Sequence, residues 1–191
     1  SEARNFAIKA IDLDSSKHNY FYNLASIEKD LGDEQSSIEF YLKAITIKRN
    51  YSEALFSLSI VYLTQQNFLK GWDLYEARFD VAGVKYKRAR DQFSLDTIGP
   101  KNILLRVEQG IGDQIMYGTI FDEMIKSPNT FIISVDPRLI DLLERSFKGK
   151  TNLRFVSLTT IIDKSLYDFH LPLGGLGKFF RNSRDDFKSQ P

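Results

Sequence analysis

The sequence predicts a two-part fold, in which helical repeats are followed by an α/β domain with a parallel sheet. The first part repeats itself: Asn5–Leu13 aligns with Glu39–Ile47, a shift of 34 residues. After Lys101, short apolar runs alternate with helical patterns, which is typical of β-α-β units. A segment with two glycines, 108–113, joins the first of these runs to a helix. We therefore expect an α + α/β fold with repeats over 1–79, a linker over 80–100 and a sheet domain over 101–191.

The composition is that of an ordinary soluble globular protein. With 191 residues, 42% of them hydrophobic, the chain can form one large core or two small ones. Because 26 Lys and Arg face 25 Asp and Glu, no strong field favours nucleic acid or a membrane surface. No apolar run approaches the roughly 18 residues of a membrane-spanning helix, so no membrane span is expected.

Cysteine is absent from the sequence. This excludes disulfides, thiolate zinc sites and cysteine nucleophiles. It also fits a cytoplasmic location, which we take as the expected compartment.

The repeat half carries small and large side chains at matching positions. The 34-residue shift relates Leu24 to Leu58, Ala25 to Ser59 and Ser37 to Gly71. Small residues let two antiparallel helices approach closely, and the large ones fill the space between them. In this phase residues 1–14 are the second helix of a repeat whose first helix is missing, so we expect further repeats upstream.

These segments resemble tetratricopeptide repeats in their period and in the spacing of their small and large residues. Gly32 stands in the turn between two helices, but its counterpart is Gln66. Arg49 replaces the proline at the repeat end, and Arg78 replaces the small residue found at Ala10 and Ala44. The resemblance implies a concave surface for a protein or peptide partner. We expect three aromatic residues at core positions of the repeat to be core rather than ligand contacts: Tyr41, Tyr62 and Tyr75.

The second half shows strand and helix patterns in alternation. Strands are expected at 103–107, 131–135, 153–156 and 167–171, and helices at 114–126, 138–147 and from Leu176. Right-handed crossovers place the carboxyl ends of parallel strands at one edge. Open α/β sheets bind their ligands at that edge, so the loops after the four strands are the expected site.

The linker contains a basic stretch, 85–90, with Asp80, Asp91 and Asp96 nearby. Lys and Arg clusters can mark nucleic-acid binding. The acidic neighbours and the nearly neutral chain instead favour a solvated loop.

The loop after the first strand is the strongest candidate site. Gly110 and Gly112 allow a sharp turn, and a helix that follows presents N–H groups to an anion. The segment can therefore receive a phosphate or a sugar. Asp113 is either the N-cap of the helix that begins at Gln114 or a catalytic carboxylate. Gly110, Gly112 and Gln114 are the substrate-binding candidates beside it.

Other nucleotide and catalytic motifs fit less well. A P-loop needs Gly-Lys-Ser/Thr, but Asp113 and Gln114 follow Gly112; a dinucleotide fingerprint needs a third glycine where Ile115 stands. Asp136 lies where a ribose-binding acid would, although Asp136-Pro137 also matches an N-cap and a first-turn proline, and nicotinamide binding stays an alternative. Two histidines, His18 and His170, in different halves do not favour zinc, and no nucleophile-elbow motif supports a serine hydrolase.

Three segments together resemble a known family: 71–79, 103–113 and 169–173. They are similar to bacterial proteins that join tetratricopeptide repeats to a heptosyltransferase-like glycosyltransferase, a family 9-like enzyme of the B fold. The resemblance implies that the α/β part is the N-terminal Rossmann-like half of a two-domain enzyme whose cleft lies between the halves. It also implies that Asp113 is the base for the acceptor hydroxyl, with Gly110 and Gly112 shaping the loop.

The same resemblance sets expectations for ligands. A nucleotide-sugar donor is held mostly by the second half of such enzymes, so this chain alone is expected to be inactive and to carry no cofactor or metal of its own. A sugar or glycosylated acceptor would bind at the Gly110 loop. His170, expected at a strand end on the same edge, either touches the acceptor or is hydrogen-bonded within its loop.

A second hypothesis is a non-catalytic interaction scaffold with a degenerate nucleotide-binding-like domain. The two differ at the strand-end edge. An open cleft beside Asp113 favours the transferase, and a loop filled by side chains such as Phe93 or Tyr117 favours the scaffold.

Overall fold

The structure is a computed structural model, and it describes residues 1–82, 99–108 and 110–187. The chain divides into two compact units, Ser1–Lys85 with Ser183–Pro191 and Tyr86–Asn182. The predicted helical and α/β character is confirmed. The domain boundaries at 79, 100 and 101 stay a prediction. Most of the expected linker, with its basic stretch, lies outside the described residues.

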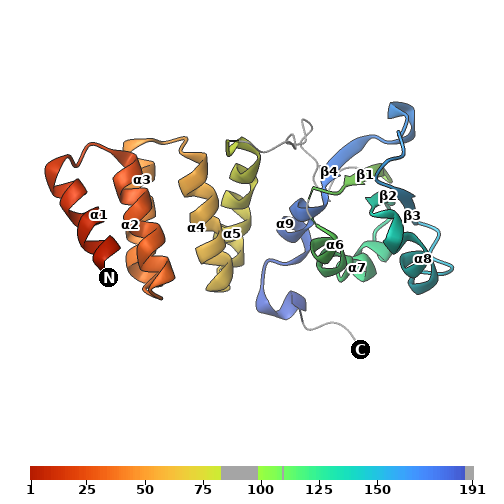
Figure 1. Ribbon diagram of the computed structural model, residues 1–191. Helices are drawn as coiled ribbons and strands as arrows, with labels where there is room; N and C mark the ends of the chain where they lie inside the picture. Colours follow the sequence, from red (N-terminus) through yellow and green to blue (C-terminus); the bar gives the residue numbers. More distant parts are fainter. Residues whose placement is uncertain (83–98, 109, 188–191) are drawn as a thin grey trace. The chain divides into compact units, whose positions relative to one another are not determined.

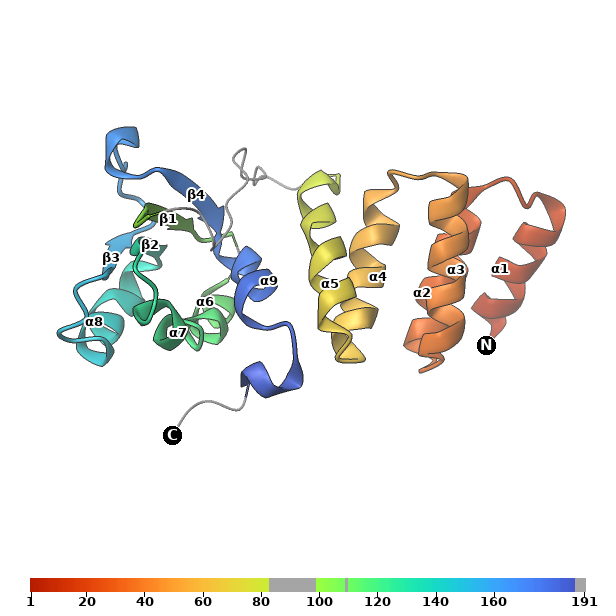
Figure 2. The same ribbon diagram turned by 180° about the vertical axis from the view of Figure 1, so that it is seen from behind.

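The first unit is built from α-helices that follow one another in antiparallel pairs (Figures 1 and 2). They are α1 (Glu2–Leu13), α2 (His18–Asp30), α3 (Glu34–Ile47), α4 (Ser52–Thr64) and α5 (Phe68–Tyr75). Two short 3-10 helices, η1 (Glu76–Asp80) and η4 (Arg184–Phe187), also belong to this unit. The ring of Phe187 in η4 lies 5.0 Å from that of Phe68 in α5.

The turns inside the two helix pairs have the same left-handed backbone, although only one of them has glycine. Gly32 has a φ of +85° and Gln66 a φ of +60°. Glycine adopts this conformation without a steric cost, whereas a residue with a Cβ does not. In the first turn, Asp33 also caps α3 by accepting a hydrogen bond from the Ser36 N–H. The repeat geometry is therefore kept at Gln66 against its local preference.

The repeat phase places the core of this unit as predicted. Ala25, Ala44 and Tyr41 are fully buried, and Leu24 and Leu58 are 1% exposed. Tyr75 is buried, whereas Tyr62 is half-buried and packs against this core. Arg78 is buried as well, and its guanidinium stacks on the rings of Tyr75 and Phe79 at 4.3 and 4.0 Å. The larger residue is thus accommodated by stacking.

The second unit holds a four-stranded sheet in the order β3-β2-β1-β4, with every pair parallel. Its strands are β1 (Asn102–Arg106), β2 (Thr130–Val135), β3 (Leu153–Ser157) and β4 (Phe169–Pro172). The other elements are α6 (Ile111–Gly118), α7 (Phe121–Ile125), α8 (Pro137–Ser146), η2 (Lys164–Leu166), η3 (Leu173–Leu176) and α9 (Gly177–Phe180). The predicted parallel sheet is confirmed, and its carboxyl ends share one edge.

One face of the sheet carries the core of this unit. Alternate strand residues such as Ile103, Ile133 and Phe155 pack against side chains of α6 and α7, with side chains of α8 packed around them. The single helix predicted over 114–126 is wrong, because α6 ends at Gly118 and α7 begins at Phe121. Both helices still bury apolar side chains against the same face, which explains why their pattern looked continuous.

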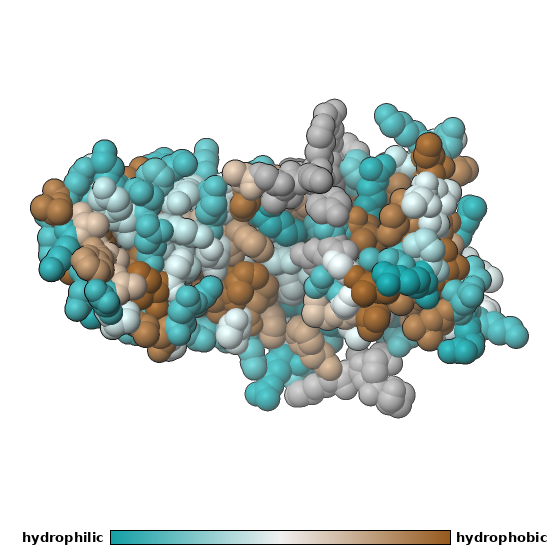
Figure 3. Space-filling model, viewed as in Figure 1, coloured by the Kyte–Doolittle hydropathy of each residue, from teal (hydrophilic) through white to brown (hydrophobic). Residues whose placement is uncertain are grey.

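Large apolar side chains are also exposed in both units. Examples are Leu13 on α1, Ile115 and Met116 on α6, and Ile161, which is 97% exposed. Figure 3 shows hydrophobic residues scattered among hydrophilic ones on the surface. No helix among the described residues has both the length and the apolar character needed to cross a bilayer.

Candidate functional site

A narrow space lies at the carboxyl edge of the sheet, where β1 runs into α6 and β4 runs into η3. It has about 140 Å³ of empty volume, and its lining residues are Val107, Glu108, Asp113, Gln114, Tyr117, Leu173 and Gly174. Glu108, Asp113, Gln114 and Tyr117 are thus neighbours at the edge where open α/β sheets bind ligands, although the exposed wall of the space itself is apolar. Two of the predicted site residues, Asp113 and Gln114, are among them.

Asp113 lies inside the first turn of α6, two positions beyond its first residue. The N-cap is Gly110, whose φ of −65° and ψ of 174° are extended, and whose carbonyl accepts the Gln114 N–H at 3.2 Å. The N-cap interpretation of Asp113 is therefore wrong. Its half-buried carboxylate is close to the loop, since a Cβ at Gly110 would lie 3.6 Å from Oδ2. Asp113 is left as an acidic group at a helix start, where negative charge is favourable.

The two glycines of the loop are both exposed. A Cβ at Gly112 would meet nothing within 4 Å. Both backbones are thus accessible at the start of α6, where helices leave N–H groups without intrahelical acceptors. Gln109, which lies between Glu108 and Gly110, is outside the described residues.

Gln114 joins the first loop to the loop after β2. Its side chain is buried, and its Oε1 accepts a hydrogen bond from the Asp136 N–H at 2.8 Å. This bond crosses from α6 to the start of α8. The structure thus gives Gln114 a bond that fixes two strand-end loops relative to each other, in addition to its place on the wall of the space.

Asp136 is the N-cap of α8, as its sequence context predicts. Its Oδ1 accepts the Arg138 N–H, and both its oxygens accept hydrogen bonds from the Arg138 guanidinium at 2.9 Å. These bonds hold the pKa of the Asp136 carboxyl at about 2. Since both oxygens are occupied by protein groups, the arrangement favours the cap over ribose binding.

Glu108 is a buried carboxylate that the motif analysis did not single out. It is 8% exposed, and its Oε1 accepts the Gly174 N–H at 3.0 Å. The bond spans 66 residues of sequence, so no local pattern could have revealed it. The only sequence signal is a charged residue directly after a buried strand.

His170 lies within β4 and not after it. In the register its neighbour is Leu104, whereas Leu105 and Leu171 are neighbours on the core face. Because side chains alternate across a strand, His170 projects to the face opposite α6 and α7, and its ring contacts Tyr167 at 6.3 Å. The expectation of His170 at a strand end is wrong, and it does not line the space with Asp113.

Of the two side chains expected to distinguish the transferase from the scaffold, only Tyr117 lies among the described residues. Tyr117 is 5% exposed and lines the space beside Asp113. Phe93 lies outside the described residues. Within the described part of the chain, no group of three or more acidic, histidine or cysteine side chains could hold a metal ion.

Comparison with known proteins identifies the repeats. The tetratricopeptide repeat family model matches residues 18–51. Residues 18–51 are a tetratricopeptide repeat. This match covers α2 and α3 and confirms the resemblance for that part of the chain. Among curated proteins, none is similar in sequence to this chain.

Solved structures similar to the chain include two proteins. The first, described as the MamA protein, has 24% identity and a TM-score of 0.39, with 41% of this chain and 43% of that one covered. The second is an O-GlcNAc transferase mutant, K341M, from Thermobaculum terrenum, with 15% identity and a TM-score of 0.38. That match covers 83% of this chain and 32% of the transferase, so the chain spans less than half of either protein.

Proposed function

We propose that this chain joins protein-binding helical repeats to the acceptor-side half of a glycosyltransferase. The observation that carries the proposal is the position of Asp113. Its carboxylate is half-buried in the first turn of α6, at the carboxyl edge of a parallel sheet. The exposed backbones of Gly110 and Gly112 lie beside it. A sugar hydroxyl can approach such a loop closely because neither glycine has a side chain.

In the proposed reaction the acceptor hydroxyl oxygen attacks the anomeric carbon of a nucleotide sugar. The new C–O bond forms as the bond from the anomeric carbon to the diphosphate breaks, and the nucleoside diphosphate leaves with the electron pair. Asp113 takes the proton of the hydroxyl as general base. Gly110 and Gly112 shape the acceptor loop, and Gln114 holds it against the loop after β2. His170, on the opposite face, has no step in this scheme.

The repeats supply the second part of the proposal. Tetratricopeptide-type solenoids form extended concave surfaces that bind peptides and proteins. We assign the repeats of α1 to α5 to binding a protein or peptide partner, which either is the acceptor or brings the acceptor to the sheet edge. The heptosyltransferase-like relationship belongs to this proposal and rests on the segments 71–79, 103–113 and 169–173.

The chain alone is expected to be inactive. The space beside Asp113 has essentially no volume in which a water molecule would fit, whereas ligand pockets commonly have about 300–1,000 Å³. A complete site would need further walls to enclose the donor. The same small volume, with Tyr117 buried beside it, favours the second candidate function, a non-catalytic scaffold with a degenerate nucleotide-binding-like domain.

Measurement of nucleoside diphosphate release from a panel of nucleotide sugars separates the two candidates. We would compare residues 1–191 with the natural gene product that contains them. Each would be supplied with a cell extract of the organism from which the gene comes, as the source of acceptor. Release is expected only from the gene product, and Asp113→Asn should lower it by about 10²–10⁴-fold. Asp141→Asn, at an exposed position on α8, is the matched control and should leave release unchanged.

Two outcomes would overturn the transferase. One is full activity of the Asp113→Asn variant, which would leave the carboxylate without a role as base. The other is absence of release from the gene product with every donor, which would favour the scaffold. Release by residues 1–191 alone would contradict the expected inactivity.

A further inference from the structure

We infer that the segment after β4, residues 173–181, is a brace that holds both ends of α6 and thereby positions Asp113. The inference rests on the proposed function, because α6 matters as the helix that carries the base. Two residues position α6 through this segment: Arg181, which belongs to it, and Glu108, which binds it. Glu108 begins the two-glycine segment 108–113, whereas Arg181 belongs to no motif recognised in the sequence; both are buried, with exposures of 8% and 5%.

At the start of α6 the contact is made through Glu108. This residue directly precedes the loop that leads into the helix, and its carboxylate accepts the N–H of Gly174 in η3 at 3.0 Å. A hydrogen bond to a buried charged acceptor is stronger than one between neutral groups. It ties the β1–α6 loop to the segment after β4.

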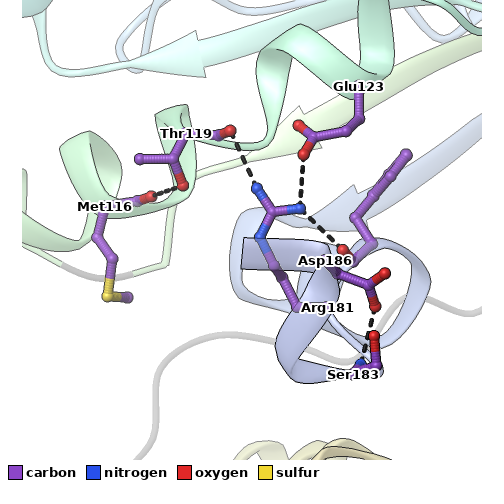
Figure 4. Close-up of polar contacts among 7 residues, drawn as sticks. Met116, Thr119, Glu123, Arg181, Ser183 and Asp186 are labelled. Carbon is purple, nitrogen blue, oxygen red and sulfur yellow. Dashed lines mark hydrogen bonds and ion pairs between the residues drawn. The ribbon is translucent and has the colours of Figure 1, made fainter. Parts of the chain in front are cut away.

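At the end of α6 the contact is made through Arg181 (Figure 4). Its Nη2 donates to the carbonyl oxygen of Thr119, the C-cap of α6, at 3.0 Å. Its Nη1 donates to Oε1 of Glu123 on α7 at 2.8 Å and to its neighbouring carbonyl, that of Phe180, at the same distance. One guanidinium therefore joins α6, α7 and the end of α9.

The chemistry of this contact suits the end of a helix. The last carbonyl groups of a helix lack intrahelical donors and carry partial negative charge, which a cation stabilises. Thr119 contributes to the same ending, since its Oγ1 donates to the Met116 carbonyl at 2.8 Å (Figure 4). The break between α6 and α7, which the helical pattern did not predict, is thus the place where Arg181 inserts its charge.

The two contacts come from one short segment. Gly174 and Arg181 belong to the same η3–α9 region, and they bind groups on either side of α6: Glu108, three residues before the helix, and Thr119, its C-cap. We infer that a helix held at its C-cap and by the loop leading into it cannot readily rotate or slide without straining one of these buried hydrogen bonds. Asp113, in the first turn, is then held in one orientation toward the Gly110 loop. The guanidinium is suited to this task, since its fork of donors reaches several acceptors at once, here three.

Amide hydrogen exchange followed by NMR on residues 1–191 tests the brace without any substrate. In Arg181→Met, exchange at Tyr117 and Gly118 should become about tenfold faster or more, as expected for the loss of charged hydrogen bonds. The amides of Leu104 and Ile133 in the strands should keep their rates. Arg181→Lys keeps the charge but not the fork, and should not restore protection. Arg145→Met, at an exposed arginine in the last turn of α8, is the control.

The contact at Glu108 can be tested with one variant that removes the acceptor and one that keeps it. Glu108→Ala should expose the Gly174 N–H to exchange, whereas Glu108→Gln keeps an oxygen acceptor and should protect it. The carboxyl ¹³C resonance of Asp113 should move or broaden in Arg181→Met and Glu108→Ala, and stay in place in Glu108→Gln. Equal loss of protection in α6 and in the strands, unchanged exchange in α6, or full rescue by Arg181→Lys would overturn the brace.

Failure of the brace and failure of the proposed function can be told apart. The exchange rates depend only on the fold, whereas the base role is tested by the loss of transfer in Asp113→Asn. If α6 loses protection in Arg181→Met while Asp113→Asn keeps its activity, the brace stands and the base role falls. The reverse pattern would leave Asp113 as base without the brace.

Discussion

The two units both bury polar or charged side chains, and several of these make hydrogen bonds over different distances along the chain. In the described part of the repeat unit, Arg78 binds groups two and three residues away and Ser59 binds the Phe56 carbonyl. In the α/β unit, Glu108 reaches across 66 residues and Arg181 across 58 and 62. Local bonds can be inferred from local patterns. Bonds that depend on the tertiary fold cannot.

The repeat unit also has bonds between neighbouring helices, such as that of the fully buried Tyr41 hydroxyl with Ser26 Oγ at 3.0 Å. Glu28 is 2% exposed, and its Oε1 accepts Arg4 Nε at 2.7 Å across 24 residues. This pair joins α1 to α2, two consecutive helices that pack against each other. Even here the partner lies in the neighbouring helix, as expected for a solenoid in which each element contacts its neighbours.

The largest expected effect is a loss of stability in the α/β unit that leaves the repeat unit unchanged. Phe121 is fully buried in the α/β unit, and its ring contacts those of Phe147 and Phe155. Phe121→Ala should lower the free energy of unfolding of that unit by about 3–5 kcal/mol. Trp72, the one tryptophan of the sequence, lies in α5 and reports on the repeat unit. Denaturant unfolding followed by tryptophan fluorescence should therefore keep its midpoint, while the circular dichroism transition moves.

Leu58→Ala is the counterpart in the repeat unit, where the side chain is 1% exposed. It should cost about 2–5 kcal/mol and shift the fluorescence transition. If either substitution shifts both transitions equally, the two units unfold as one and the comparison between them fails.

A smaller effect is expected at Gly71, where α5 packs tightly against Leu63 of α4. A Cβ at Gly71 would lie 2.6 Å from side-chain atoms of Leu63 and 3.2 Å from its backbone N. Gly71→Ala should thus force α4 and α5 apart and destabilise the repeat unit by about 1–3 kcal/mol. Gly112→Ala is the matched control in α6, where a Cβ meets nothing within 4 Å. Thermal unfolding that shows equal losses in both variants would contradict the close packing.

The turn at Gln66 offers a gain in stability. Because its φ is +60°, replacement by glycine should remove backbone strain of about 1 kcal/mol. Gln66→Gly should therefore raise the midpoint of denaturant unfolding of the repeat unit. Gly32→Ala, at the corresponding turn, should lower it by a similar amount. A loss of stability in Gln66→Gly would mean that the glutamine side chain stabilises the turn more than its backbone strains it.

Titration of Asp136 is the mildest probe of the α/β edge. Hydrogen bonds from Arg138 lower its pKa to about 2 in the folded chain, below about 3.9 in an unfolded one. The carboxylate therefore stabilises the fold above about pH 4, and this contribution is lost as the pH falls from about 4 to 2. NMR titration should show a higher Asp136 pKa in Arg138→Ala and no change in Arg145→Ala. An unchanged value in Arg138→Ala would exclude the ion pair as the cause.

The fold could be predicted further than the site. The repeat period places Leu24, Ala25 and Tyr41 in a core. The alternation of strand and helix patterns along the chain predicts a parallel sheet. Both predictions depend on local spacing. The helix start at Ile111 was missed because Gly110, a weaker cap signal than aspartate, takes the N-cap position. The break after Gly118 was missed because its stabilising partner, Arg181, is 62 residues from Thr119.

The same reason limits the prediction of the site. Asp113, Gly110 and Gly112 lie in one local motif and could be proposed as site residues from sequence. Glu108 binds a distant amide, and the face on which His170 lies depends on the register of β4 with β1. Side chains that act through tertiary contacts need the fold before their role can be inferred.

We propose that the Asp113 carboxylate acts as the base at the sheet edge. The most direct measurement is the rate of nucleoside diphosphate release by the natural gene product and its Asp113→Asn variant, with equal donor binding verified for both. The rate should be lower by about 10²–10⁴-fold in Asp113→Asn and unchanged in Asp141→Asn. Equal rates in the wild type and Asp113→Asn would contradict it.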